Sequence, residues 1–492
     1  MHVNVITGDE HDLGGGQGLA HAGHSHHGPV VFDSPAAPAD PNVLAQLAEG
    51  VKDADLAAPP VVLPDFHHKH NMEMPSSIAV ATTGSIRPTL TSASVNCGMA
   101  LIALDIERPG RAAVTEFYRK VRERYPYPTT HRRDLRAGDV VRTAAEGGLF
   151  AVDRFGVDPG ELDAVEEGGR LDVERYGGAD RVRKELPFSV KHLSRMRFGT
   201  VGPSNHFVEL QEVEEILDPV AASELGINQG QITLQYHAGG GVLTGEIGRM
   251  FGRRKDFPKP LRVQMAVQKP LYHLARARSL SELRQRFELY FSGACPPVPR
   301  DGAEGERYML ANAVAMNYGF AFRLATYASL RKLFDETFGP TGSRLIVDSP
   351  HNSIYEEEVD GQVALVHRHN SCRAYPAEKM AGHSRFGRTG QAILLPGTNR
   401  TSSYLCVAGQ GAARSLYSAC HGAGTMISDF VARGLSGADP QGRRTLKFGY
   451  GDAAPAEVAH YDDRGVNEAL KILTGPGLVH PVARMRPFAV LN

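Results

Sequence analysis

The segment around His421 is the part of this sequence that most narrows the kind of reaction the protein could catalyse. His421 follows Cys420 and precedes Gly422-Ala423-Gly424, so a side chain able to attack an electrophile adjoins a backbone that phosphate can approach closely. Four other segments place a thiol or an imidazole next to small or polar residues: Asn96-Cys97-Gly98-Met99, Asn205-His206-Phe207-Val208-Glu209, His237-Ala238-Gly239-Gly240-Gly241 and His351-Asn352. Together they indicate a metal ion and a nucleotide meeting at one histidine.

Each of these motifs also has a simpler interpretation. A lone cysteine such as Cys97 is more often a small buried hydrophobic residue than a ligand, and a lone strand histidine is usually a hydrogen-bonded core residue. The run Gly239-Gly240-Gly241 is typical of an ordinary turn. Recurrence favours a site, because four histidines and a cysteine each lie beside Gly, Asn or Pro, where backbone packs closely against a ligand.

Composition places the protein among ordinary globular proteins. The 492 residues are 42% hydrophobic and carry a net charge of -1, so nothing attracts nucleic acid globally and RNA binding would need a local basic patch. Five dispersed cysteines suit a reducing cytosol better than a disulfide framework. With no long apolar run and no secretory signal, we expect a cytoplasmic protein that does not enter a membrane.

The order of expected elements indicates an α+β fold. Residues 1–35 are rich in Gly and His and predict a flexible arm; residues 36–492 predict one large domain. Apolar spacing predicts helices over 40–54, from Ser279 with a capping box to Glu282, and over 308–338. Short strands are expected at 61–65, 198–210, 231–237, 344–347, 363–367, 392–395 and 404–407. Without regular βαβ spacing, these strands do not predict a doubly wound sheet.

Read in order from about position 40 to the C-terminus, the motifs resemble the RtcB family of RNA-splicing ligases. The resemblance rests on Pro64-Asp65-Phe66-His67, Cys97-Gly98-Met99, Gly199-Thr200-Val201-Gly202-Pro203-Ser204-Asn205-His206-Phe207, His237-Ala238-Gly239, Asn317-Tyr318, His351-Asn352, Val366-His367-Arg368, Arg373-Ala374-Tyr375-Pro376, Pro396-Gly397, Ser418 to Gly424 and Val482 to Pro487. It implies an α+β ligase that acts as a monomer. Such an enzyme would use Mn²⁺ and GTP to join an RNA 3′-phosphate or 2′,3′-cyclic phosphate to a 5′-hydroxyl.

The resemblance also assigns roles by position. It implies that His421 accepts GMP and that Cys97, His206, His237 and His351 bind one or two metal ions; this thiolate and imidazole set would also hold Zn²⁺. The implied nucleotide-binding residues are Asn205, His206, Phe207, Glu209, Asn352, Pro396, Gly397, Thr398, Asn399, Ser403, Gly422, Ala423, Gly424 and Tyr461. Physically, Asn amides and glycine N–H groups suit phosphates, and Glu209 suits the guanine edge.

Several residues depart from the family pattern at functional positions. Ser94 stands where the family carries a metal-binding aspartate, and a neutral hydroxyl is a poor ligand for a hard dication. Gly241 and Thr425 replace two arginines, and Asn492 replaces a lysine near the C-terminus. Two alternatives to a ligase therefore stay open. One is a metal-dependent phosphodiesterase or nucleotidyltransferase acting on another phosphorylated end, and the other is a non-catalytic sensor of RNA ends.

Overall fold

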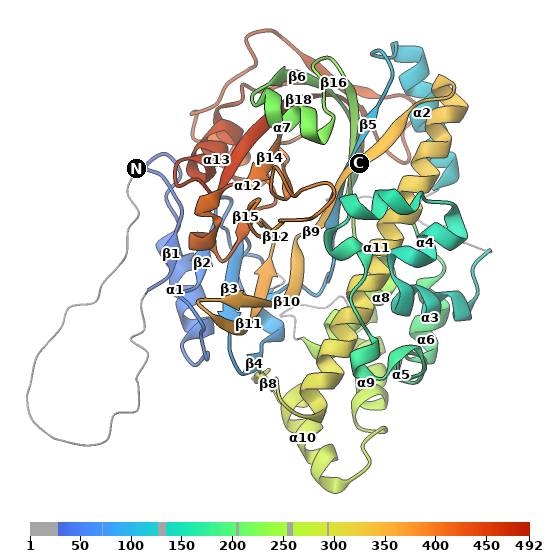
Figure 1. Cartoon of the computed structure of the whole chain (residues 1–492), viewed down its shortest axis with the longest axis vertical. Coiled ribbons are helices and arrows are strands. Elements are labelled where there is room, and N and C mark those ends of the chain that lie inside the picture. Colours follow the sequence, from blue (N-terminus) through green and yellow to red (C-terminus); the bar gives the residue numbers. More distant parts are fainter. Residues whose placement is uncertain (1–27, 71, 126–133, 203–205, 253–258, 293–294) are drawn as a thin grey trace, which may run out of the picture.

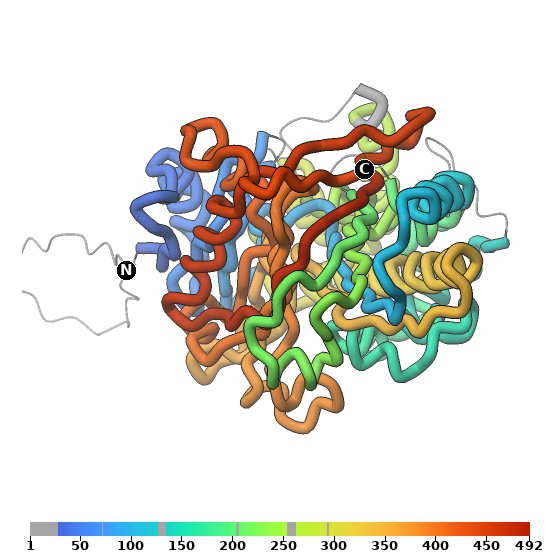
Figure 2. The backbone as a smooth tube through the Cα atoms, turned by 90° about the horizontal axis from the view of Figure 1, so that it is seen from above, coloured from blue at the N-terminus to red at the C-terminus, as the bar shows by residue number. Residues whose placement is uncertain are grey.

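A computed structural model describes residues 28–492 except 71, 126–133, 203–205, 253–258 and 293–294. Figure 1 shows most strands on one side of the molecule, together with a few helices, and most helices on the other side. Figure 2, seen from above, shows the N-terminal segments in dark blue on the side opposite the long yellow helix, while the C-terminal segments in red run from that side across the top of the view. The fold is α+β, as the order of elements predicts.

The helices and strands have the following bounds. The α-helices are α1 Pro41–Val51, α2 Arg111–Arg124, α3 Ala137–Glu146, α4 Gly148–Phe155, α5 Gly178–Glu185, α6 Phe188–Ser194, α7 Pro219–Leu225, α8 Gly241–Phe251, α9 Lys259–His273, α10 Leu280–Phe291, α11 Ala303–Phe338, α12 Gly424–Ala432 and α13 Arg464–Thr474. The strands are β1 Val30–Val31, β2 Val61–Val62, β3 Ile78–Thr82, β4 Ser85–Ile86, β5 Gly98–Leu104, β6 Phe207–Ile216, β7 Ile232–Ala238, β8 Val298–Pro299, β9 Ser343–Pro350, β10 Asn352–Val359, β11 Gln362–His369, β12 Ser371–Arg373, β13 Ala392–Leu395, β14 Ser403–Ala408, β15 Ser418–Cys420, β16 Arg444–Phe448, β17 Ala456–Ala459 and β18 Val479–Leu491.

Two sheets position the motif residues. In the described part of the chain the larger sheet has nine strands; seven follow the order β13-β14-β18-β6-β7-β5-β9, and β16 pairs with β18 and β17. The smaller one has five strands in the order β1-β2-β3-β11-β10. Because β9 and β10 are separated by one residue, His351, that residue lies where one sheet passes into the other.

The helix expected over 308–338 is confirmed as α11, which begins five residues earlier, at Ala303. Nearly every residue from Tyr308 to Tyr327 is buried, so this stretch packs on all sides and not by a single apolar stripe. Within it, Arg323 is fully buried and pairs with Asp348 of β9 through a 2.7 Å hydrogen bond from Nε. This Arg323–Asp348 pair therefore anchors α11 to the larger sheet, close to the metal-ligand motifs.

The two shorter predicted helices also form, one expected from apolar spacing and one from a capping box. Asp40 caps α1 by accepting a hydrogen bond from the Asn42 amide, at 2.8 Å. Ser279 caps α10 by accepting from the Glu282 amide at 3.1 Å, while the Glu282 carboxylate accepts from Arg278. Phe287 on α10 is 55% exposed, so the apolar residues of this helix only partly face the core.

The strand expected over 198–210 is wrong in its first half. β6 begins at Phe207 and continues to Ile216, whereas residues 195–202 form turns and coil and 203–205 lie outside the described residues. Gly199 has a φ of 66°, a left-handed conformation that interrupts an extended chain. The other expected strands form, with ends shifted by a few residues.

Residues 28–35, the last part of the segment expected to form an arm, are described by the structure. Val30 and Val31 pair in parallel with Val61 and Val62, so the end of the 1–35 segment belongs to the smaller sheet. Residues 1–27 lie outside the described part, and the division into an arm and one domain stays a prediction. Among the described helices, none combines the length and apolar character needed to span a bilayer.

Candidate metal and nucleotide site

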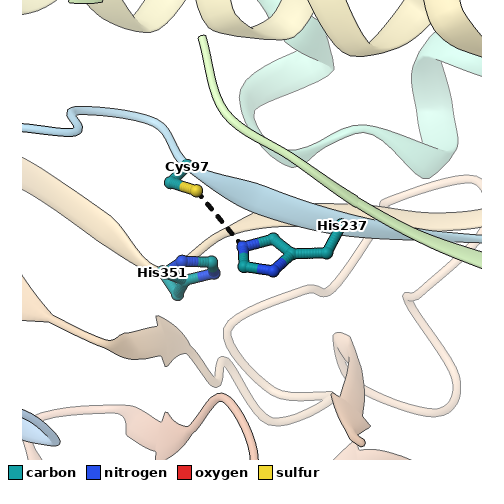
Figure 3. A group of neighbouring side chains, drawn as sticks. All are labelled: Cys97, His237 and His351. Atoms are coloured by element: carbon teal, nitrogen blue, oxygen red, sulfur yellow. Dashed lines mark hydrogen bonds between the residues drawn. The ribbon is translucent and has the colours of Figure 1, made fainter. Parts of the chain in front are cut away.

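Three neighbouring strands of the larger sheet deliver a thiol and two imidazoles to one point. Cys97 immediately precedes β5, His237 lies at the end of β7 and His351 directly follows β9 (Figure 3). Since Gly98 pairs with both Ala238 and Pro350, the three ligand positions share one end of the sheet. Their ligand atoms all lie within 4.8 Å of one another, and all three residues are buried.

This set fits a transition-metal ion. The Cys97 Sγ atom lies 3.2 Å from His237 Nε2, and His351 Nδ1 is a buried nitrogen without a hydrogen-bond partner in the described part of the chain. One thiol and two imidazoles form a borderline-soft donor set that suits Zn²⁺ and, with added oxygen ligands, Mn²⁺. A glycine adjoins the set: a Cβ at Gly239 would lie 3.2 Å from the His206 ring and 3.6 Å from Cys97 Sγ.

Burial sets the protonation of the group. It raises the pKa of the Cys97 thiol to about 12, although Arg323 acts in the opposite direction, so the thiol is protonated at neutral pH until a cation displaces the proton. Burial and the neighbouring His421 and His237 hold the pKa of His351 well below its usual range. Its imidazole is therefore neutral and ready to donate a lone pair.

His206, the fourth expected ligand, lies beside the group of three without completing it. Its Nε2 atom is 3.6 Å from Cys97 Sγ, and its ring centroid is 5.0 Å from that of His237. Burial, with Arg197, lowers the pKa of His206 to about 4, so this ring is also neutral. Ser94 lines a cavity of about 390 Å³ beside His206, at the position where the resemblance implies a carboxylate.

His421 reaches the same place through a separate two-stranded sheet of β12 and β15. β12 pairs with β15, which ends one residue before His421, and the Ser371 amide donates to the His351 carbonyl at 3.0 Å. The His421 ring centroid lies 4.2 Å from that of His351 and 6.4 Å from that of His237. The predicted convergence of distant strand ends on this histidine is therefore present.

The His421 imidazole is held in the form of a nucleophile. Burial, followed by the nearby positive charge of Lys69, lowers its pKa to about 3. Its ring is also hydrogen-bonded to the Asn370 backbone. A neutral imidazole that donates through one ring nitrogen keeps a lone pair on the other.

The loop that carries Cys97 is fixed from three sides. The Asn96 side chain donates to the Met316 carbonyl of α11, at 2.5 Å, and Arg323 donates to the Asn96 carbonyl at 2.6 Å. Asn352 donates to the Ser94 carbonyl at 3.2 Å and accepts from the Asn370 amide at 3.0 Å. The Asn352 amide, expected at the nucleotide, thus joins the Ser94 loop to the residue that contacts His421.

Most of the other expected nucleotide-binding residues form one cluster around the β13–β14 turn. Ala423 donates from its backbone to the Pro396 carbonyl at 3.1 Å, which joins this turn to the segment after His421. Ser403 accepts from the Gly397 amide at 3.1 Å, and Thr398 bonds to Thr401 within the turn. Asn399 is half-buried in the same turn, and Phe207 is half-buried with its ring 5.9 Å from that of His237. Asn205 lies outside the described residues.

Glu209 and Tyr461 are placed at either side of this cluster. Burial raises the pKa of Glu209 to about 8, and its carboxyl accepts from Gln211, whose amide also reaches Ser403. One face of the Tyr461 ring is covered by the Arg400 guanidinium, 3.6 Å from its centroid. Base stacking on Tyr461 would therefore use the opposite ring face, or require Arg400 to move.

Asp65 and Lys69 belong to the site although neither was assigned a role from the sequence. The Asp65 carboxylate accepts from the Met426 amide at 2.7 Å and bonds to the Thr425 amide, so it occupies two N–H groups at the start of α12. These amides are consequently not free for phosphate. The signal available in the sequence was only the landmark Pro64-Asp65-Phe66-His67, which does not show that this loop meets α12.

Known proteins with similar sequences share one family. The profile of the family described as "tRNA-splicing ligase RtcB" matches residues 51–492. A tRNA-splicing ligase RtcB of Thermococcus kodakarensis is 26% identical over 459 residues, which cover 87% of this chain and 86% of that protein. An RNA-splicing ligase RtcB of Mycobacterium tuberculosis is 30% identical over 356 residues, 69% of this chain and 74% of that protein.

The Pyrococcus relatives are longer. A tRNA-splicing ligase RtcB of Pyrococcus horikoshii is 28% identical over 417 residues, which cover 80% of this chain and 44% of that protein. The chain thus spans less than half the length of that relative. Since the family profile covers nearly all of the described residues and includes every ligand position of the site, the chain belongs to the RtcB family.

Proposed function

We propose that the protein is a metal- and GTP-dependent RNA ligase. It would join an RNA 3′-phosphate or 2′,3′-cyclic phosphate end to a 5′-hydroxyl end through a guanylylated His421, in RNA repair or tRNA splicing in the cytoplasm. The observation that supports this proposal most directly is the contact between the His421 ring and that of His351, which belongs to the buried group of Cys97, His237 and His351. Family membership supports the RNA substrate, and the donor set supports Mn²⁺, with Zn²⁺ as a competitor.

The first half-reaction would be the transfer of GMP from GTP to His421. The free ring nitrogen of His421 attacks the α-phosphorus of GTP; a P–N bond forms, the bond from the α-phosphorus to the bridging oxygen breaks, and pyrophosphate leaves with the electron pair. The other nitrogen keeps its hydrogen, held at the Asn370 backbone. A divalent ion bound by Cys97, His237 and His351 would supply positive charge beside the phosphates.

The second half-reaction passes the nucleotide to RNA. An oxygen of the 3′-phosphate attacks the guanylyl phosphorus, which breaks the P–N bond and leaves the RNA end activated by GMP. The 5′-hydroxyl oxygen then attacks the 3′-phosphorus, GMP leaves, and a phosphodiester forms. A cyclic phosphate must first be opened by water to give the 3′-phosphate.

The test of this proposal is covalent labelling. Purified protein incubated with Mn²⁺ and α-labelled GTP should retain an acid-labile label through denaturation, and His421→Ala should carry none. His480→Ala, which changes an exposed histidine of β18, is the matched control and should label like the wild type. An unlabelled wild-type protein under every divalent ion tried would reject the proposal.

One alternative is favoured by a specific feature of the cavity. Ser94 and Gly241, two departures from the family pattern, both line the 390 Å³ cavity next to His206. Loss of a carboxylate and a guanidinium there weakens contacts to a second substrate more than contacts to GTP. A nucleotidyltransferase that forms guanylyl-histidine but acts on another phosphorylated end is therefore the second candidate. Label without joining of RNA carrying 3′-phosphate and 5′-hydroxyl ends would favour it.

A further inference from the structure

Lys69 lies in the loop between β2 and β3, which the smaller sheet and α12 hold in place. Within this loop the Ser76 amide donates to the His67 carbonyl at 3.0 Å. The Ser77 amide donates to the carbonyl of His369, the last residue of β11, at 2.9 Å. At its start, Asp65 fixes the loop to the first turn of α12 through the Met426 amide. The half-buried Lys69 is therefore carried by a segment that is tied down at both ends beside His421.

The Lys69 ammonium influences the pKa values of the candidate metal ligands and of His421. Its positive charge lowers the pKa of His351, His369 and His421. The ionised Asp65 carboxylate, followed by the Cys97 thiolate, would in turn stabilise it. Within the described residues it has no hydrogen-bond or ion-pair partner. A partly buried cation without a partner is costly unless an anion joins it, so its position indicates an anionic ligand.

Among the residues that the structure describes, the candidate metal site also lacks a carboxylate that could hold a second metal ion. In the described part of the chain, the clustered metal-ligating groups are Cys97, His237 and His351, and no carboxylate joins them. Ser94 offers only a hydroxyl beside Cys97 and His206. One dication would leave much of the charge of a nucleoside triphosphate uncompensated in a site where burial strengthens every electrostatic term.

We propose that the Lys69 ammonium binds phosphate oxygens of the nucleoside triphosphate and replaces the positive charge of a second metal ion. This inference rests on the proposed function and adds to it a residue that contacts the substrate. Lys69 transfers no proton in the step. It stays an ammonium while the P–N bond to His421 forms and pyrophosphate leaves, and it neutralises charge on the phosphates.

The experiment compares Lys69→Met, Lys69→Arg and Lys69→Met combined with Ser94→Asp. Lys332→Met, which removes an exposed lysine of α11, is the matched control. Bound Mn²⁺ per chain is measured by elemental analysis after equilibrium dialysis, GTP affinity in Mn²⁺ by calorimetry, and folding by the thermal midpoint. Neither binding measurement depends on guanylylation or on RNA joining.

We expect one Mn²⁺ per chain in the wild type and in Lys69→Met, with GTP affinity about tenfold lower in Lys69→Met because a charge-assisted contact is lost. Lys69→Arg and Lys332→Met should stay within about threefold of the wild type by the same affinity arithmetic. Adding Ser94→Asp to Lys69→Met should raise the count to two Mn²⁺ and restore GTP affinity, because a second ion then supplies the missing charge.

Three results would overturn the inference. The first is two Mn²⁺ per chain in the wild type, and the second is unchanged GTP affinity in folded Lys69→Met. The third is a double variant that binds two Mn²⁺ yet still binds GTP weakly. In all three cases the wild type binds GTP, so the proposed function survives. A wild-type protein that binds Mn²⁺ but no GTP would reject the proposed function and the role of Lys69 together.

Discussion

At the scale of single residues, the site combines groups whose burial changes their protonation in opposite directions. The imidazoles of His206 and His421 are held neutral, with pKa values lowered to about 4 and about 3. The carboxyl of Glu209 is buried as well, and its pKa is raised to about 8. The histidines are therefore ready to donate lone pairs at pH 7, whereas most Glu209 side chains still carry a proton that a guanine ligand must displace.

Glu209 accordingly predicts a pH-dependent affinity for GTP. Guanine offers N–H donors, which an ionised carboxylate accepts better than a protonated one, so binding at pH 7 should release close to one proton. Affinity should rise by up to about tenfold per pH unit below pH 8 and level off above it. Calorimetry in two buffers with different ionisation enthalpies measures the proton release.

The matched variant for this measurement is Glu209→Gln. An amide keeps one acceptor oxygen and does not titrate, so the variant should bind GTP more weakly, with little pH dependence between 6.5 and 8.5. The same pH dependence in both proteins would assign the proton to another group and contradict the role of Glu209.

At the scale of elements, the loop after β2 and the start of α12 depend on one carboxylate. Asp65 has a φ of 65°, and its side chain bonds to the Met426 and Thr425 amides. Asp65 therefore accepts hydrogen bonds from free N–H groups at the start of α12, as an N-cap residue does, although it comes from a distant part of the chain. The loop carrying Lys69 and the segment carrying His421 are therefore fixed to each other.

Replacing Asp65 by Ala should loosen both segments. The loss of the bonds to α12 is expected to lower the free energy of unfolding by about 1–2 kcal/mol, and alanine also tolerates positive φ poorly. Urea unfolding at pH 6 measures the change. Burial raises the pKa of Asp65 to about 7, so most Asp65 carboxyls are protonated at pH 6, and the comparison with alanine is then between two neutral side chains.

Asp65→Asn is the control for that experiment. Asparagine tolerates left-handed backbone and keeps an acceptor oxygen, so this variant should retain most of the stability. Equal losses in the alanine and asparagine variants would show that the bond to α12 is not what the carboxylate contributes.

Patterns within one element could be predicted from the sequence, and contacts between distant elements could not. The length of α11, the position of α1 and the cap of α10 follow from local spacing, which acts within a few residues. The strand expected over 198–210 failed because Gly199 adopts positive φ, which apolar content does not reveal. Of the four expected metal-ligand positions, three cluster in the structure, Cys97, His237 and His351, and each lies at a strand end beside a small or polar residue.

The remaining parts of the site depend on tertiary packing. Asp65 meets Met426 across 361 positions of sequence, and Asn352 bonds to Ser94 across 258. No local signal reports such contacts, so the sequence alone assigned Lys69 no role and placed the Asn352 amide at the nucleotide. In the structure Asn352 bonds to the Ser94 carbonyl and the Asn370 amide. The charge of Lys69 acts on His421.

At the scale of the whole molecule, the candidate metal ligands connect separate parts of the fold. Cys97 directly precedes β5 and His237 lies in β7 of the larger sheet, while His351 lies at the junction with the smaller sheet. Arg323 of α11 holds the Cys97 loop. An ion bound by all three ligands would therefore resist separation of these parts. Because an unfolded chain does not present this arrangement, metal binding should stabilise the folded state.

We expect that stabilisation to grow with metal concentration and with pH. At a free Mn²⁺ or Zn²⁺ concentration 100-fold above the dissociation constant, it should reach about 2.7 kcal/mol, seen as a higher denaturant midpoint. The Cys97 thiol, with a pKa raised to about 12, must lose its proton to bind, so the shift should be larger at pH 8 than at pH 6.5. Cys97→Ser should lose most of the shift, whereas Cys295→Ser, outside the cluster, should keep it. A shift of the same size in Cys97→Ser would place the stabilising ion elsewhere, because a serine hydroxyl cannot replace a thiolate in this donor set.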